Sequence, residues 1–147
     1  MVLLDDERGA RATRDELVKQ KLIRDDNVLF VTEAFGSPTP PEADIEDVLD
    51  PAVYEPLVGE SYRDELKGKS LNMNNQIPRI VRRYEEAFKG VGLDFHKSRP
   101  ARLLLDKMAN NPAAILTPLT KERFQRLFEK ISAQWGRHTA RGASPFR

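Results

Sequence analysis

Three acidic residues, Asp5, Asp6 and Glu7, directly follow the short apolar segment Val2-Leu3-Leu4. Such an unbroken apolar run is typical of a strand buried on both faces of a parallel sheet, and open α/β sheets bind ligands at the carboxyl ends of their strands. Because side chains alternate along extended backbone, we expect Asp5 and Glu7 to share one side and Asp6 to point away. Paired carboxylates suit Mg²⁺. The alternative is a solvated acidic turn that caps the next helix.

A second acidic cluster contains Asp44, Glu46 and Asp47, interleaved with apolar residues that could anchor it. If the two clusters met, repulsion between their carboxylates would be severe without cations, so proximity would favour a metal site. The alternative is an acidic helix N-terminus, which the helix dipole favours by about 0.3–1 kcal/mol per charge.

The segment His96-Lys97-Ser98-Arg99-Pro100 forms a compact basic entry to a predicted helix. A lysine near bound metals could stabilise the charge that grows on a phosphate in a transition state. Lys97 and Arg99 could instead position a phosphate without catalysis, or form a solvated helix start. The chain has no cysteine, which excludes disulfide scaffolds, thiolate zinc sites and thiol nucleophiles.

The elements that must position these residues begin as a βαβ unit. Residues 2–4 and 28–32 predict two buried strands, and Thr13 with Glu16 forms a capping box that predicts a helix between them. Two strands make a poor sheet, so we expect the chain to be a piece of a larger protein. The predicted fold class is α/β: a partial parallel sheet, then a mainly helical C-terminal part.

The rest of the sequence predicts helices. Asp50-Pro51 predicts a helix start, with the helix running through Leu57, and apolar stripes predict three later helices with core-facing sides. Gly136 should end the last of these, and Phe128→Ala should cost about 3–5 kcal/mol if the stripe is core. The stripes are Ile77, Ile80, Val81, Tyr84 and Phe88; Ala101, Leu104, Leu105 and Met108; and Phe124, Leu127, Phe128, Ile131 and Trp135.

Charge divides the chain into an acidic and a basic half. Residues 1–66 carry a net charge of −10 and residues 67–147 a net charge of +11. This asymmetry indicates either a nucleic-acid or acidic partner, or two halves that pack against each other. We expect an acidic α/β unit (1–66), a flexible connection (67–76), a basic helical part (77–136) and a disordered basic tail (137–147). No apolar run approaches the roughly 20 residues that span a bilayer, so we expect a cytoplasmic protein.

The order of these blocks resembles a known family. Leu-Leu-Asp5-Asp6-Glu7-Arg-Gly, then Glu42-Ala-Asp44-Ile-Glu46-Asp47-Val-Leu, then Phe95-His-Lys97-Ser-Arg-Pro-Ala resemble the C-terminal region of the overcoming-lysogenization-defect (OLD) family of ATP-dependent endonucleases. The nuclease part of that family is a TOPRIM domain, a metal-binding α/β fold shared with topoisomerases and primases. The resemblance covers roughly residues 2–136.

The resemblance implies a DNA endonuclease with two Mg²⁺ or Mn²⁺ ions flanking the scissile phosphate. Asp5 and Glu7 correspond to the first acidic pair of the family, Asp44 and Glu46 to the second, and Lys97 to its catalytic lysine. Asp6 and Asp47 are additional acids of the same blocks. The resemblance also implies an ATPase domain or subunit in cis or in trans, and it allows a homodimer.

The sequence departs from the family pattern in three respects. Glu7 stands where the family usually has Asp, and the earlier strand with its glutamate and the ATPase domain are both missing. An isolated chain that does not cut DNA is therefore one expected outcome. Two alternatives follow: a non-catalytic module that binds nucleic acid or an ATPase partner, and a pseudo-nuclease that binds metal without cleaving.

Overall fold

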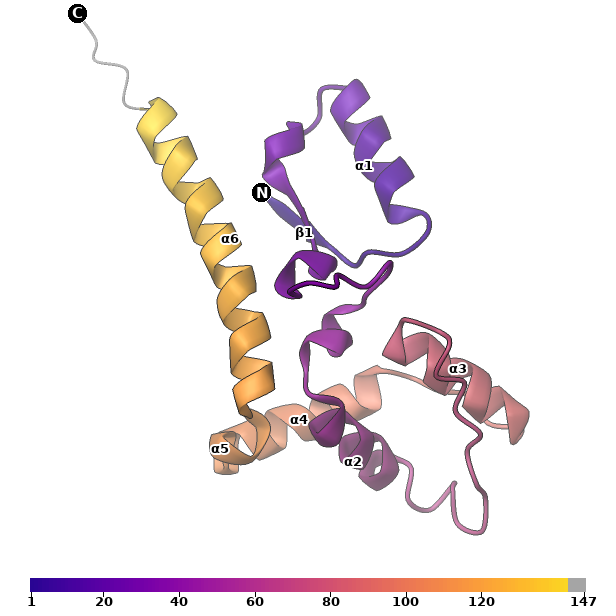
Figure 1. The fold of residues 1–147 in the computed structure, drawn as a ribbon. Helices are drawn as coiled ribbons and strands as arrows, with labels where there is room; N and C mark the ends of the chain where they lie inside the picture. The colour runs from indigo at the N-terminus through magenta and orange to yellow at the C-terminus, as the bar shows by residue number, and fades with distance from the viewer. Residues whose placement is uncertain (143–147) are drawn as a thin grey trace, which may run out of the picture.

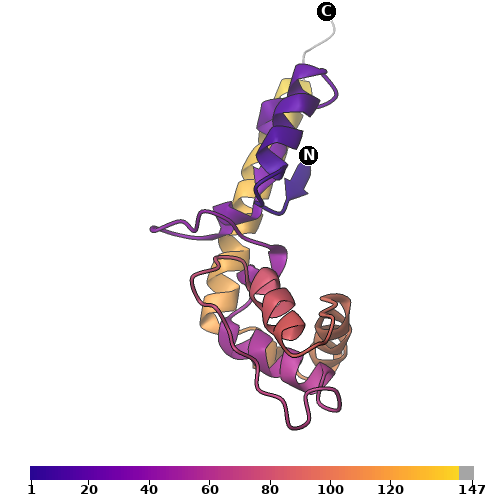
Figure 2. The same cartoon turned by 90° about the vertical axis from the view of Figure 1, so that its right-hand side faces the viewer.

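The computed structural model describes residues 1–142, with the side chains of residues 1–136. Strands β1 (Val2–Leu4) and β2 (Val28–Phe30) pair in parallel, and helix α1 (Ala10–Lys19) connects them. The βαβ unit and the coarse α/β class are therefore confirmed. This unit forms one end of an elongated molecule, and α2, α3 and α4 form the other (Figures 1 and 2).

Helices make up most of the remaining structure. In the described part of the chain no helix is long and apolar enough to cross a membrane. The remaining elements are η1 (Asp25–Asn27), η2 (Val31–Ala34), η3 (Ile45–Val48), α2 (Pro51–Ser61), α3 (Ile80–Gly90), α4 (Ser98–Asn110), α5 (Pro112–Ile115) and α6 (Pro118–Gly142).

The two strands differ in burial. All of β2 is buried as predicted, but Val2 and Leu3 are 37% and 38% exposed, so the prediction of two-sided burial for β1 is wrong. The reason is that β2 is the sole neighbour of β1 within residues 1–142, which leaves one strand edge uncovered. The second strand is also shorter than predicted, because η2 begins at Val31 and Glu33 accepts a hydrogen bond from the Phe30 N–H.

The first helix begins earlier than its capping signal predicts. Helix α1 starts at Ala10 with Gly9 as its N-cap, so the predicted N-cap at Thr13 is wrong. The Thr13 hydroxyl instead donates a hydrogen bond to the Gly9 carbonyl one turn back. By contrast, the Asp50 cap is confirmed, because its carboxylate accepts from the Ala52 N–H at 2.9 Å.

The larger hydrophobic core lies between α2, α3 and the start of α4. Tyr62, Tyr84, Phe88 and Phe95 form one aromatic cluster, with Tyr62 and Phe88 edge-on at 4.6 Å between ring centroids. Edge-on rings gain about 0.5–1.5 kcal/mol beyond their area burial. The stripe predicted for α3 is confirmed as core. Because α2 belongs to this cluster too, the core crosses position 66.

The stripes of the last two long helices are only partly core. On α6, Leu127 is 2% exposed, but Phe128 and Trp135 are 60% and 65% exposed, so the prediction of a buried Phe128 is wrong. On α4, Leu105 is 69% exposed, while Leu104 packs against the core. Each helix contacts the body along a face narrower than its apolar stripe.

The last helix continues past its predicted end. Helix α6 runs to Gly142 rather than ending at Gly136, so the first part of the predicted tail is helical. Gly136 has no φ in the left-handed region that a glycine helix end commonly uses. The rest of the tail, residues 143–147, lies outside the described residues.

Candidate functional site

The backbone brings the two acidic clusters together. The Asp6 N–H donates to the Ala43 carbonyl at 2.8 Å, and the Ala43 N–H donates back to the Asp6 carbonyl at 3.1 Å. Beside this bridge, the Asp5 carboxylate accepts a hydrogen bond from the Ile45 N–H at 2.9 Å. The residues that follow β1 therefore lie against the residues that enter η3, as the hypothesis of converging acids requires.

Lys97 connects one acid from each cluster. Its Nζ lies 3.7 Å from Asp5 Oδ2 and 3.4 Å from Glu46 Oε1. Partial burial lowers the pKa of the Lys97 ammonium, but the charges of Glu46 and Asp5 outweigh it and the pKa ends above its usual value. The lysine therefore carries its positive charge at neutral pH. It reaches the acids from the turn before α4, where the sequence placed it.

Arg79 connects the other two acids. It donates to Asp44 Oδ1 from Nε at 2.9 Å and from Nη2 at 2.6 Å, and its Nη1 lies 3.2 Å from Glu7 Oε2. The sequence analysis missed this arginine. It lies at the N-cap of α3, within the apolar stripe that Ile77 begins, and one arginine at such a position carries no recognisable pattern.

Four carboxylates thus surround two basic side chains. We call Asp5, Glu7, Asp44 and Glu46, with Lys97 and Arg79, the acidic site; its formal charges leave an excess of two negative charges. Each basic side chain pairs one acid from the first cluster with one acid from the second. Convergence of the two clusters is therefore a property of this structure.

Asp44 is the buried member of the acidic site. Its side chain is 1% exposed, and its Oδ2 atom has no hydrogen-bond partner among the described residues. Burial raises the pKa of Asp44, which the hydrogen bonds from Arg79 oppose only in part. An unpartnered buried carboxylate oxygen is costly, and it marks a position where a water or a cation would be stabilised.

The other two predicted acids have structural partners. Asp6 is buried and accepts hydrogen bonds from Arg11 at 3.1 and 2.6 Å and from the Thr32 hydroxyl at 2.6 Å. It therefore ties α1 to η2. Because its two oxygens already hold three donors, Asp6 has little capacity left for a ligand.

Asp47 caps the N-terminus of α3. Its carboxylate accepts from the Ile80 N–H at 3.0 Å and from the Asp44 N–H at 2.8 Å. Burial raises the pKa of Asp47 to about 6, even though both backbone hydrogen bonds lower it. Asp47 thereby holds the start of α3, and with it Arg79, beside η3.

Arg99 lies apart from the acidic site. It pairs with Glu65 at 2.6 Å, donates to the Ser61 carbonyl and stacks over the Tyr62 ring at 3.9 Å. Its partners thus lie at the end of α2 and in the turn that follows, whereas Lys97 faces the acids. The structure does not bring the two predicted phosphate contacts, Lys97 and Arg99, to the same group.

The donor atoms and the charge of the acidic site suit a divalent cation, but its carboxylates are not arranged around a common point. Its donors are hard carboxylate oxygens, its excess charge is negative, and Asp44 Oδ2 is unpartnered. Among the described residues, however, no group of three or more Asp, Glu or His side chains is arranged to hold a metal ion. The carboxylates point toward Lys97 and Arg79. Lys97 is the more displaceable of the two, because its contacts are longer than 3.3 Å and it is 48% exposed.

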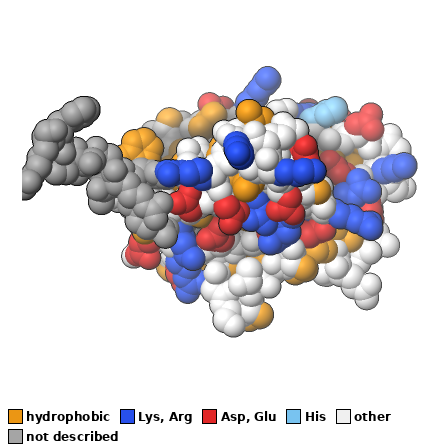
Figure 3. All heavy atoms as spheres, turned by 90° about the horizontal axis from the view of Figure 1, so that it is seen from above, with side chains coloured by type: hydrophobic (Ala, Val, Ile, Leu, Met, Phe, Trp, Pro, Cys, Tyr) orange, Lys and Arg blue, Asp and Glu red, His pale blue; other side chains and the backbone are white. Residues whose placement is uncertain are grey.

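The two oppositely charged halves of the sequence pair with each other. Arg79, Lys97, Arg99, Lys107 and Lys130 of the second half all form ion pairs with acids of the first half. Accordingly, blue and red side chains are interspersed on the face shown in Figure 3. These ion pairs join the acidic half of the sequence to the basic half.

Searches against protein-family models, curated proteins and solved structures find no match to this chain. Functional inference therefore depends on the geometry of the acidic site.

Proposed function

We propose that this chain is a metal-dependent DNA endonuclease domain of the TOPRIM type, as in OLD-family enzymes. The observation that carries the proposal is the pairing of each basic side chain, Lys97 and Arg79, with acids from both clusters. Carboxylates so far apart in sequence gather at the carboxyl end of β1, where open α/β sheets bind ligands. Their excess negative charge and the unpartnered Asp44 oxygen favour a cation.

In this proposal Asp5, Asp44 and Glu46 would hold Mg²⁺ or Mn²⁺, with Glu7 beside them. A divalent cation at this position would supply activation of water and stabilisation of the leaving oxygen during phosphodiester hydrolysis. Arg79 fixes Asp44 through two hydrogen bonds, which leaves Asp44 Oδ2 as its free ligand atom. Asp5 is fixed in turn by the Ile45 N–H, which leaves its Oδ2 toward Lys97.

Lys97 has two roles in this hypothesis. In the free protein its ammonium neutralises Asp5 and Glu46. With DNA bound, the same charge on a half-exposed and flexible side chain would move to the phosphate and stabilise the negative charge of the transition state. The raised pKa of Lys97 keeps the ammonium protonated for this role at neutral and mildly alkaline pH.

A plasmid-nicking assay with Mn²⁺ or Mg²⁺ tests the proposal. We expect the wild-type chain to nick supercoiled DNA, and Lys97→Ala and Asp5→Ala each to lower the rate at least 100-fold. Lys89→Ala and Asp94→Ala are matched controls, because both side chains are exposed and neither is joined to the acidic site by an ion pair among the described residues. Equal rates in Lys97→Ala, Asp5→Ala and wild type would refute the proposed roles.

A second candidate function has its own support. Lys97 and Arg79 already neutralise much of the acidic charge, and the carboxylates are arranged around them rather than around a shared centre. The acidic site would then be a permanent ion-pair network in a non-catalytic module that binds nucleic acid or an ATPase partner.

Calorimetric titration with Mn²⁺ separates the candidates. Binding that is lost in Asp44→Asn supports the nuclease, and binding without nicking indicates a pseudo-nuclease. If no Mn²⁺ binds but duplex DNA does, with an affinity that falls steeply with salt, the module is the better account.

A further inference from the structure

A cavity of about 490 Å³ lies beside η3. Its walls come from the loop before η3, from η3 itself, from the start of α3 and from α6. A volume of this size falls within the range typical of small-molecule sites, about 300–1,000 Å³. Its lining residues include Phe35, Thr39, Glu42, Asp47, Arg83 and Arg123.

Two guanidinium groups line this cavity without acidic partners. Arg83 donates to the carbonyls of Ile77 and Pro78, and Arg123 donates to those of Asp47 and Leu49 at 2.8 and 3.1 Å. Within the described part of the chain neither arginine forms an ion pair with a carboxylate. A guanidinium has five N–H donors, so both retain donors for an anion.

The electrostatics of Arg123 agree with an unfilled anion position. Burial lowers the pKa of Arg123, and the nearby charges of Asp50 and Asp47 do not compensate for it. Elsewhere in this molecule half-buried arginines pair with acids, as Arg79 does with Asp44. A partly buried guanidinium without an ion-pair partner is costly, and an anionic ligand would relieve that cost at Arg123.

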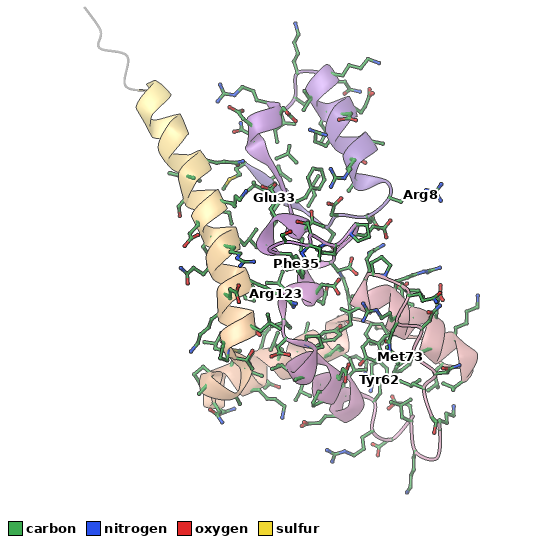
Figure 4. All side chains as sticks on the ribbon, viewed as in Figure 1. Arg8, Glu33, Phe35, Tyr62, Met73 and Arg123 are labelled. Atoms are coloured by element: carbon green, nitrogen blue, oxygen red, sulfur yellow. The ribbon has the colours of Figure 1, made fainter. Side chains whose placement is uncertain are left out.

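Much of the rest of the cavity wall is apolar. Phe35 lies beside Arg123, with the guanidinium carbon 4.7 Å from the ring centroid (Figure 4). Leu49, Ile80 and several prolines complete the wall. Glu42 adds one carboxylate that forms no hydrogen bond or ion pair among the described residues, so it can accept from an amino group. Two guanidinium groups, an apolar wall and one hydrogen-bond acceptor suit a nucleotide.

We propose that this cavity binds a nucleoside monophosphate, with the phosphate on Arg83 and Arg123 and the base between the prolines and Phe35. The ligand could be a free nucleotide or the terminal nucleotide of a strand, since both present the same chemistry. The proposed nucleotide site needs no metal, so its test is independent of the test of the nuclease proposal.

Titration in the presence of EDTA tests this assignment. With the wild-type chain, we expect deoxyadenosine monophosphate to bind at least tenfold more tightly than either inorganic phosphate or deoxyadenosine. A 5′-phosphorylated oligodeoxynucleotide that binds more tightly than the mononucleotide identifies a strand end as the ligand; equal or weaker binding identifies the free nucleotide. No binding, or inorganic phosphate binding as tightly as the mononucleotide, overturns the proposal.

Substitutions at the rim test the site without disturbing the fold. Thr39 is exposed and lines the cavity, so Thr39→Glu should weaken mononucleotide binding at least fivefold by charge repulsion. Glu42→Gln should tighten the binding of inorganic phosphate, since it removes one negative charge from the cavity lining. Unchanged affinity in Thr39→Glu would contradict the proposal.

The arginines themselves form the third test. Arg123→Gln should weaken mononucleotide binding at least tenfold, whereas Arg102→Gln, an exposed arginine on α4, should leave it unchanged. Because Arg123 also supports two backbone carbonyls, its variant is compared only after a thermal melt shows a folded chain. If Arg123→Gln does not fold, the Thr39→Glu result decides.

Discussion

The region around α2 and α3 is held by aromatic packing, whereas the region that joins the sheet to η3 is held by buried carboxylates. In the first, Tyr62 and Phe88 are almost completely buried and every ring contacts another. In the second, Asp6 and Asp44 are equally buried, and their partners are arginines. Apolar burial is favourable in itself, but buried charge pairs often contribute little net stability. The carboxylate region therefore costs stability that an apolar region would not, which is consistent with a functional role for its charges.

Removing a partner from the carboxylate region should be among the most damaging changes. Arg79→Ala leaves Asp44 buried without its two strongest hydrogen bonds, and we expect a loss of about 3–5 kcal/mol in unfolding free energy. Urea denaturation measures the loss. Arg82→Ala, which removes exposed ion pairs on the same helix, is the matched control and should cost less than about 1 kcal/mol. Equal losses in both variants would mean that Asp44 is not held by Arg79.

Truncating a buried side chain in the aromatic region should lower the unfolding free energy by a similar amount, through lost packing rather than a lost ion pair. Phe88 is 0% exposed and contacts Tyr62, Tyr84 and Phe95, so Phe88→Ala should lower the unfolding free energy by about 3–5 kcal/mol. The same denaturation series measures it. The loss in unfolding free energy should not depend on ionic strength in Phe88→Ala, whereas in Arg79→Ala it should. A strong salt dependence would mean that packing and charge are not separated between the two regions.

The carboxylate region should also respond to pH. The pKa of Asp47 is about 6 in the folded protein against an ordinary 3.8, so between these values the folded state binds more protons than the unfolded state. Stability should therefore fall as pH rises from about 4 to 6, by an amount on the order of 2–3 kcal/mol for this group.

Asp47→Asn tests the source of that pH dependence. Melting temperatures between pH 4 and 7 should vary less in this variant than in wild type, although the raised pKa of Asp44 leaves part of the slope. Asp94→Asn, at an exposed position, should retain the full wild-type slope. A slope unchanged in Asp47→Asn would assign the pH dependence to other groups.

The smallest loss in unfolding free energy is expected at Phe128, which follows Leu127 on α6. Leu127 is 2% exposed and Phe128 is 60% exposed. We expect Leu127→Ala to cost about 2–5 kcal/mol and Phe128→Ala less than about 1 kcal/mol. Thermal denaturation of the pair measures the difference. A larger loss for Phe128→Ala would indicate that this ring is covered in solution.

The sequence pattern predicted where helices and strands form better than it predicted which of their side chains are buried. The α3 stripe and the Asp50 cap were predictable because each depends on residues a few positions apart. The burial of Phe128 and of β1 depends on what packs against them, and local spacing carries no such information. The Thr13 capping signal failed because Glu7, Arg8 and Gly9 form a turn that starts the helix sooner.

The acidic site was predictable in part for the same reason. Asp5, Asp44, Glu46 and Lys97 could be singled out, because acids after an apolar strand and a basic helix entry are recognisable patterns. Arg79 was not, since its role depends on where α3 docks. The strand-alternation argument agrees with these contacts: Asp5 and Glu7 both belong to the acidic site, whereas Asp6 pairs with Arg11.

The two-rung bridge between Asp6 and Ala43 has a consequence for how this protein can change. Main-chain atoms, which every amino acid except proline can supply, make both of its hydrogen bonds. Side chains on either flank can therefore be exchanged while the distance between the two segments stays fixed. During evolution the acids could therefore be lost or regained one at a time while these two main-chain hydrogen bonds still hold the segments together.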